Sequence, residues 1–246
     1  MSRGPNCTAC RDCEVCTCGE SETGLRLHLA DVFDAQLTPH SYALVYADPP
    51  YAGCRARYAR GRNSRQWGRN ARADFTRELV ARMEALRAPD GVCALSMSEP
   101  ELRLLHLFPT TARVFPWVKP TAPPRPGIWP TFAWEPIVAW GEFPTIGAAP
   151  LNWLSLSARV KDRRGHESPK PDAFAEWVLA VTLGPRTGRV CELYAGTAPV
   201  ARAAVARDCD ADAVDLDDYL SPREPAHAAD CDMGEDCRCG VSWGVA

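Results

Sequence analysis

Four consecutive residues, Asp48-Pro49-Pro50-Tyr51, carry the clearest chemical signal in the sequence. The exocyclic amine of adenine or cytosine is a poor nucleophile, because its lone pair is delocalised into the ring. A carboxylate and a rigid backbone carbonyl can accept its two N–H bonds and return electron density to the nitrogen. The prolines fix the carbonyl geometry, and the tyrosine ring offers a flat face for a flipped base. The tetrapeptide therefore predicts a catalytic loop, and a plain strand-ending turn is the alternative.

A second segment, Glu192-Leu193-Tyr194-Ala195-Gly196-Thr197-Ala198, joins an apolar strand to a helix. Its small residues let the backbone approach a ligand closely. Asp215 follows Gly196 by 19 residues and ends the next expected strand. Folds of this kind place a carboxylate there, on the ribose hydroxyls of a nucleoside cofactor. The pair predicts a cofactor site, and an ordinary turn in a cofactor-free domain is the alternative.

An arginine-rich segment follows the tetrapeptide. From Arg55 to Arg72 the chain holds seven arginines and no acidic residue. Guanidinium groups neutralise phosphates, and an aromatic ring can stack on a neighbouring base. We expect nucleic-acid contacts here in preference to a solvated loop. The candidates are Arg55, Arg57, Arg60, Arg62, Arg65, Trp67 and Arg69.

Eight of the twelve cysteines lie near the two ends of the sequence: Cys7, Cys10, Cys13, Cys16, Cys18, Cys231, Cys237 and Cys239. Tight Cys-x-x-Cys spacings suit tetrahedral zinc, and eight thiolates would fill two four-thiolate sites. The two ends also repeat a pattern of Glu, Cys, Cys and Gly, at 14–19 and 235–240. We predict a structural zinc module made from both ends. A redox-sensitive tail and iron–sulfur ligation are the alternatives.

Hydrophobic periodicity between the tails predicts alternating strands and helices. Strands are expected at 25–29, 42–47, 92–97, 137–140, 189–194 and 211–214, and helices at 74–86, 98–107, 172–183 and 199–207. The segment from Val114 to Gly141 is rich in proline and tryptophan and is expected to be mostly extended or looped. The pattern predicts an α/β fold, with a mostly parallel open sheet and helices on both faces. It assigns 24–222 to one domain, flanked by cysteine-rich segments at 1–23 and 223–246.

The bulk composition excludes little. The chain has 246 residues and a formal net charge of −3, so a nucleic-acid partner must be met by a local basic patch. No segment approaches the roughly 20 uninterrupted apolar residues of a membrane span, and the N-terminus lacks an export signal. We expect a cytoplasmic protein.

The order of these motifs resembles that of the amino-methyltransferases of DNA and RNA. In their permuted groups, the beta class of DNA amino-methyltransferases and the MT-A70-like adenine methyltransferases, the Asp-Pro-Pro-aromatic loop precedes the cofactor loop. His166-Glu167-Ser168-Pro169-Lys170-Pro171 is similar to the His-x-x-x-Lys-Pro element of that family. The resemblance covers Leu25 to about Leu220. It implies a Rossmann-like class I methyltransferase fold in permuted order.

By this resemblance, Asp48, Pro49, Pro50 and Tyr51 form the catalytic loop. S-adenosylmethionine would lie against Asp31, Lys170, Glu192, Ala195, Gly196, Thr197 and Asp215, with Lys170 near its methionine end. Ala30 and Ala198 depart from the pattern, because each stands where relatives carry a glycine. The implied substrate is adenine N6 in DNA. Cytosine N4, adenine in RNA and a nucleic-acid-binding protein without catalysis are the alternatives.

Overall fold

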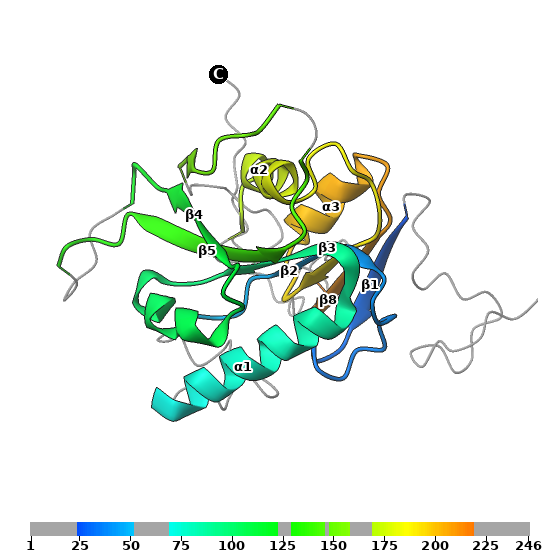
Figure 1. The fold of residues 1–246 in the computed structure, drawn as a ribbon, viewed down its shortest axis with the longest axis horizontal. Helices are drawn as coiled ribbons and strands as arrows, with labels where there is room; N and C mark the ends of the chain where they lie inside the picture. The colour runs from blue at the N-terminus through cyan, green and yellow to red at the C-terminus, as the bar shows by residue number, and fades with distance from the viewer. Residues whose placement is uncertain (1–23, 52–68, 123–128, 146–147, 158–168, 219–246) are drawn as a thin grey trace, which may run out of the picture.

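The computed structural model describes residues 24–51, 69–122, 129–145, 148–157 and 169–218, and of residues 69–71 only the backbone (Figure 1). The cysteine-rich segments lie outside these ranges. So do Arg55, Arg57, Arg60, Arg62, Arg65 and Trp67, the residues 166–168 of the His-x-x-x-Lys-Pro element, and the side chain of Arg69.

One sheet organises the described chain, in the strand order β1-β8-β7-β2-β3-β5-β4-β6. The strands are β1 (Leu25–Leu29), β2 (Tyr42–Ala47), β3 (Arg87–Ser96), β4 (Arg113–Val118), β5 (Trp134–Gly141), β6 (Leu154–Ser155), β7 (Val190–Leu193) and β8 (Ala211–Asp215). From β1 to β3 every neighbouring pair is parallel, and β5 pairs antiparallel with both β3 and β4. The α/β class and the mostly parallel sheet are thus as the sequence predicts.

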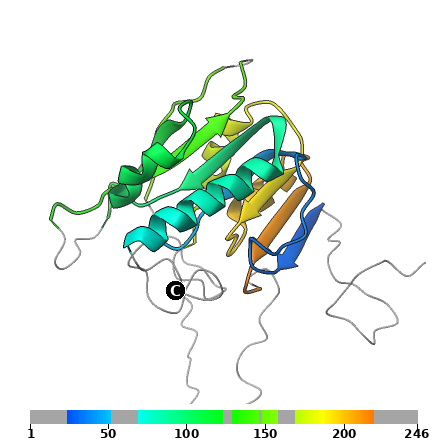
Figure 2. The same cartoon turned by 60° about the horizontal axis from the view of Figure 1, so that its bottom comes forward.

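Helices cover both faces of the sheet (Figure 2). The helices are α1 (Arg69–Leu86), the 3-10 helix η3 (Glu99–Leu107), α2 (Asp172–Thr182) and α3 (Pro199–Val205). On one face Phe75, Leu79 and Met83 of α1 pack with Val45 of β2. On the opposite face Phe174, Val178 and Val200 from α2 and α3 pack with other strand residues. β2 is therefore covered on both sides, which explains its continuous apolar sequence.

Two elements differ from the expectation. Helix α1 begins at Arg69, so Asp74 lies inside the helix and does not cap it; its carboxylate instead pairs with Arg77 one turn on. Strand β4 forms within the segment expected to be mostly looped. It tolerates Pro116 because this residue lies opposite Pro136 of β5, so both missing N–H donors fall at one position of the ladder.

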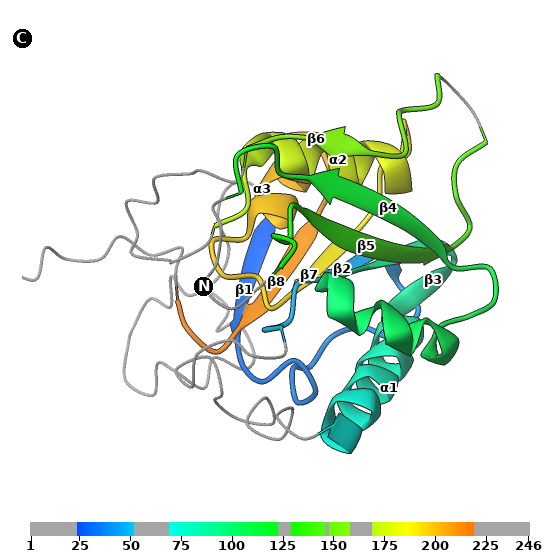
Figure 3. The same cartoon turned by 90° about the vertical axis from the view of Figure 1, so that its left-hand side faces the viewer.

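The chain reverses its direction of sheet growth between β7 and β2 (Figure 3). From β7 the chain passes through α3 to β8 on one side, and from β2 it passes through α1 to β3 on the other. The two strands are parallel neighbours, with Ala47 opposite Leu193. Open α/β sheets bind ligands beyond the carboxyl ends of the strands at such a switch point. Here Asp48 follows β2, and the turn from Tyr194 to Ala198 follows β7.

Among the described residues there is no helix long and apolar enough to cross a membrane. In the same ranges, no group of three or more histidine, cysteine or acidic side chains is arranged to hold a metal ion. The cysteines assigned to zinc lie outside those ranges, so that prediction is not tested by this finding.

Candidate active site

Asp48 lies at the carboxyl end of β2, at the switch point. Its backbone N–H donates to the carbonyl of Leu193 over 3.3 Å, which ties the start of the catalytic loop to the end of β7. The side chain is about 25% exposed. The tetrapeptide thus begins beside the predicted cofactor turn, although the two are about 150 residues apart in the sequence.

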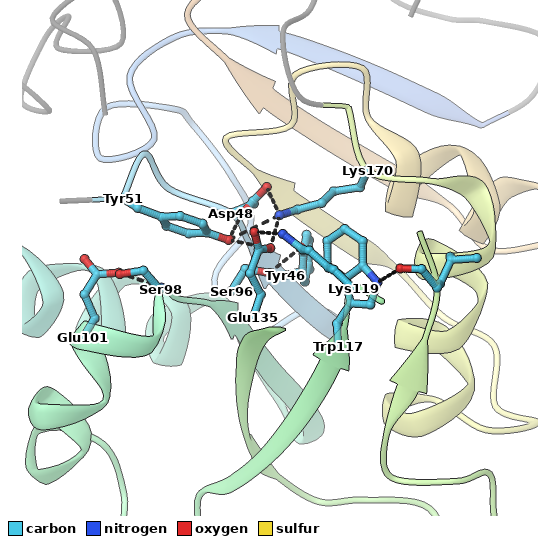
Figure 4. Close-up of polar contacts among 11 residues, drawn as sticks. Tyr46, Asp48, Tyr51, Ser96, Ser98, Glu101, Trp117, Lys119, Glu135 and Lys170 are labelled. Atoms are coloured by element: carbon cyan, nitrogen blue, oxygen red, sulfur yellow. Dashed lines mark hydrogen bonds and ion pairs between the residues drawn. The ribbon is translucent and has the colours of Figure 1, made fainter. Parts of the chain in front are cut away.

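The Asp48 carboxylate has a partner on each oxygen (Figure 4). The Tyr51 hydroxyl donates to Oδ1 over 3.0 Å. The Lys170 ammonium lies 3.1 Å from Oδ2. Lys170 also donates to the Tyr51 hydroxyl over 3.2 Å. The structure therefore brings together three predicted site residues, and it places Lys170 directly on the catalytic carboxylate.

A second carboxylate, Glu135 of β5, completes this cluster. Its Oε2 accepts from Lys170 over 2.9 Å and from the Tyr51 hydroxyl over 3.2 Å, and its Oε1 contacts the ammonium of Lys119. Burial alone would raise the pKa of Glu135, but the ammonium groups of Lys170 and Lys119 lower it to about 2. The two acids likewise hold the pKa of Lys170 above its ordinary value, against the effect of burial. All four charges are thus held as ions.

Aromatic rings enclose the Lys170 ammonium. Its nitrogen lies 5.3 Å from the ring centre of Trp117, 5.5 Å from that of Tyr51 and 5.6 Å from that of Phe174. The Trp117 indole is fixed by a 3.0 Å hydrogen bond to the carbonyl of Leu156. The site therefore has a largely aromatic wall, which suits both a cation and the flat face of a base.

The turn after β7 has the strained geometry of a close backbone approach. Tyr194, Gly196 and Ala198 all have left-handed backbones, with φ of 59°, 54° and 49°. The Gly196 N–H donates to Asp215 Oδ2 over 2.8 Å, so the carboxylate at the end of β8 braces the turn. Burial raises the pKa of Asp215. Ala198, which replaces a family glycine, adopts a glycine-like conformation at a cost of about 1 kcal/mol.

Glu192 faces inward below that turn. Its Oε2 accepts the N–H of Ala201 in α3 over 2.7 Å. Burial raises its pKa to about 8, against the lowering effect of this bond and of the Val200 N–H. Of the other predicted cofactor residues, Ala195 and Thr197 are buried within the turn. Asp31 follows β1 on the far side of β8, where Oδ1 accepts the Phe33 N–H over 3.1 Å and closes a local turn.

Sequence reasoning missed two members of the cluster, Lys119 and Glu135. It treated Trp134-Glu135-Pro136 as scaffold. A signal was present, because both are charged residues next to tryptophans in otherwise apolar strand segments. What joins them is the antiparallel register of β4 and β5, which sets Trp117 opposite Glu135 and leaves Lys119 just beyond β4.

One predicted nucleic-acid segment is corrected at its end. Arg72 closes the run of seven arginines, yet its side chain is only about 4% exposed and pairs with Glu101. Its guanidinium also donates to the carbonyl of Pro50 over 3.2 Å. Arg72 therefore does not present its charge to a phosphate, and it supports the catalytic loop from within.

Comparison with known proteins identifies the fold. No protein-family model and no curated protein matches the sequence. Among solved structures, the cytosine-N4-specific PvuII DNA methyltransferase matches with a TM-score of 0.62 at 14% identity, covering 79% of this chain and 82% of that one. The M1.HpyAVI complex with SAM matches with a TM-score of 0.55 at 15% identity, covering 79% and 94%.

A third structure is a DNA modification methylase of Thermus thermophilus, TTHA0409, whose printed description calls that function putative. In complex with S-adenosyl-L-methionine it matches with a TM-score of 0.50 at 19% identity. That alignment covers 78% of this chain and 88% of the other. At these identities the likeness concerns the fold. The chain has a methyltransferase fold of the kind found in DNA methyltransferases.

Proposed function

We propose that the protein is an S-adenosylmethionine-dependent methyltransferase that acts on an exocyclic amine of DNA. One observation carries the proposal: at the sheet's switch point, the Asp48 loop and the small-residue turn after β7 lie on adjacent parallel strands. A reaction between a base amine and a bound methyl donor needs both partners at one place, in line and shielded from water. The fold shared with DNA methyltransferases supports this assignment.

The chain's own groups can orient the amine. Asp48 accepts one N–H, and a loop carbonyl accepts the other, so the nitrogen lone pair is freed for attack. We assign the second acceptor to Pro49, because the Pro50 carbonyl already accepts from Arg72. Tyr51 contributes its ring as a stacking face. S-adenosylmethionine supplies an electrophilic methyl group when bound.

Lys170 occupies Asp48 Oδ2 in the present structure, with the type of contact that a substrate amine would make. Glu135 holds the same ammonium over 2.9 Å. An entering amine can therefore share or replace the Lys170 contact without leaving that ammonium unpaired. Lys170 and Glu135 would thus keep Asp48 ionised and correctly oriented in the absence of substrate.

The turn after β7 fits a nucleoside cofactor. Its left-handed Gly196 brings bare backbone to the surface, and Asp215 presents a carboxylate at the end of the adjoining strand. We assign cofactor contacts to Glu192, Ala195, Gly196, Thr197 and Asp215, with Asp31 at the end of β1 and Lys170 toward the methionine end. The loop of β2 precedes this turn in the chain, which supports the permuted motif order.

Adenine N6 in DNA is the substrate that we propose first, and cytosine N4 is the second. The acceptor pair at Asp48 suits both amines, and the PvuII enzyme is cytosine-N4-specific. The arginines from Arg55 to Arg69 would hold the phosphates of the substrate strand.

Expression in a methylation-deficient host, followed by nucleoside mass spectrometry of its DNA and RNA, tests this function. We expect N6-methyladenine in DNA with the wild type and none with Asp48→Ala. N4-methylcytosine would select the second substrate, and a mark confined to RNA would select the third. Equal methylation by the two proteins would exclude the role of Asp48. Soluble protein that leaves no mark and gives no calorimetric heat with S-adenosylmethionine would favour a nucleic-acid-binding function.

We also propose that the eight cysteines of 1–23 and 223–246 form a structural zinc module, which their spacing supports. Saturated thiolate sites leave no open position for substrate, so the module would fold or grip nucleic acid. Elemental analysis of purified protein is expected to give about two zinc ions per chain. Cys7→Ser together with Cys10→Ser should lower that number. Metal-free protein with eight titratable tail thiols would contradict the module.

A further inference from the structure

Arg72 and Glu101 form a buried ion pair next to the catalytic loop. Arg72 Nε contacts Glu101 Oε1, and the two side chains are about 4% and 1% exposed. Removing two charges from water costs more than their attraction returns unless further hydrogen bonds hold them. Such pairs contribute little net stability, but they fix the positions of the groups around them.

The further hydrogen bonds of this pair lead to the catalytic loop on one side. Arg72 donates to the Pro50 carbonyl over 3.2 Å. Pro49 and Pro50 have no N–H, so their carbonyls are the only backbone groups through which other elements can hold them. The bond from Arg72 thus limits rotation of the peptide unit that joins Pro50 to Tyr51.

On the other side the pair is anchored in η3. The second oxygen of Glu101 accepts both the backbone N–H and the hydroxyl of Ser98, each over 2.8 Å (Figure 4). Glu101 therefore cannot turn away from Arg72 without leaving two donors unpaired. Ser98 follows β3, the strand next to β2. The loop is thus held from its neighbouring strand.

Arg72 also contacts the cofactor side of the site. Its guanidinium lies 5.1 Å from the ring centre of Phe75, one turn along α1. The Phe75 ring in turn lies 6.4 Å from that of Tyr194, which begins the left-handed turn after β7. One side chain therefore links the loop for the base amine with the turn for the cofactor.

We propose that Arg72 is a positioning residue that sets the orientation of the catalytic loop, and that Glu101 holds it in place. This inference rests on the proposed function, because it concerns the alignment of Asp48 and the Pro49 carbonyl with the methyl donor. Neither residue touches the reacting atoms. Loss of the pair should therefore reduce the rate of transfer more than the binding of either substrate.

The test compares Arg72→Gln, Glu101→Gln and the double variant with the wild type, in the full-length protein. We expect kcat for methyl transfer to fall by about 10- to 100-fold in each single variant. The dissociation constant of S-adenosylmethionine should change by less than about threefold. The double variant should be no slower than the worse single variant, because both changes break one linkage.

Hydrogen exchange gives a readout that does not depend on activity. The amides of Asp48 and Tyr51, which flank the two prolines, should exchange about tenfold faster in Arg72→Gln. Arg77→Gln is the matched control, since Arg77 lies on the same helix in an exposed pair with Asp74. It should leave both rate and exchange unchanged. Glu101→Gln, which keeps the side-chain shape, serves if Arg72→Gln does not fold.

The outcomes separate the two proposals. Wild-type kcat and exchange in both single variants would overturn the positioning role and leave the proposed function standing. No methylation by the wild type, together with faster exchange in the variants, would overturn the function and keep the link between Arg72 and the loop. Equal losses of kcat and of S-adenosylmethionine affinity would assign Arg72 to general stability.

Discussion

The sheet carries two clusters around a buried or half-buried aspartate, one at each end of its parallel strands. At the carboxyl ends, Asp48 meets Tyr51 and Lys170. Toward the amino ends, Asp212 of β8 accepts the Tyr42 hydroxyl over 3.0 Å and Arg189 over 2.8 Å, and His28 Nε2 lies 2.8 Å from its other oxygen. The same charge chemistry therefore occurs at both ends.

The two clusters differ in how replaceable the partners are. Asp212 is about 2% exposed, and its partners come from β1, β2 and the residue before β7. Burial alone would raise its pKa, but the bonds from His28, Arg189 and Tyr42 lower it. Asp48 is about 25% exposed, and its main cation is shared with a second acid. A saturated cluster on adjoining strands stabilises the sheet, whereas a shared one can exchange a partner for substrate.

The largest expected effect on stability is at the amino-end cluster. Asp212→Ala leaves Arg189 and Tyr42 without their acceptor, and we expect the free energy of unfolding to fall by about 3 kcal/mol. Asp48→Ala is the matched change at the other end. It should cost less than about 1 kcal/mol, because Lys170 keeps Glu135. Urea unfolding of both variants measures the difference, and equal losses would remove the distinction between the clusters.

Glu135→Gln should show a pH-dependent loss. The pKa of Glu135 lies near 2 in the folded protein and near 4.5 in the unfolded chain, so its contribution is present above pH 4.5 and disappears as the pH falls toward 2. We expect the variant to be less stable by about 2–3 kcal/mol at pH 7. Thermal unfolding from pH 7 to pH 3 should show the two proteins converging. A constant gap would show that Glu135 acts through packing.

The smallest expected effect is at the cofactor turn. Ala198 has φ of 49°, and Ala198→Gly removes the strain of a left-handed backbone. Glycine also increases the entropy of the unfolded chain, which offsets part of the gain. The free energy of unfolding should therefore change by less than about 1 kcal/mol, with binding of S-adenosylmethionine retained. A loss of more than about 2 kcal/mol would show that the Ala198 methyl group is needed for packing.

Local patterns were sufficient to place the strands that bear the site. The apolar run of β2 stops at Asp48 and that of β7 stops before Tyr194, so both strands could be located by residue. Their adjacency could be inferred only from the resemblance in motif order. The capping signal of Ser98 and Glu101 was also correct, although the helix that follows is a 3-10 helix.

The contacts that long-range packing creates could not be read from the sequence. Glu135 and Lys119 are brought to the site by the pairing of β4 with β5, and β4 was hidden by its prolines. Arg72 looks like its neighbours in a basic run, yet its charge is buried against Glu101, which lies 29 residues away. Burial of a charge depends on a partner from another element, and periodicity carries no record of that partner.

The most direct test of the central claim is the rate of labelled methyl transfer from S-adenosylmethionine to DNA by purified protein. The account predicts measurable transfer by the wild type and a loss of at least about 100-fold in Asp48→Ala. It predicts a wild-type rate per folded molecule in Asp212→Asn. Transfer that survives Asp48→Ala but is abolished in folded Asp212→Asn would contradict it.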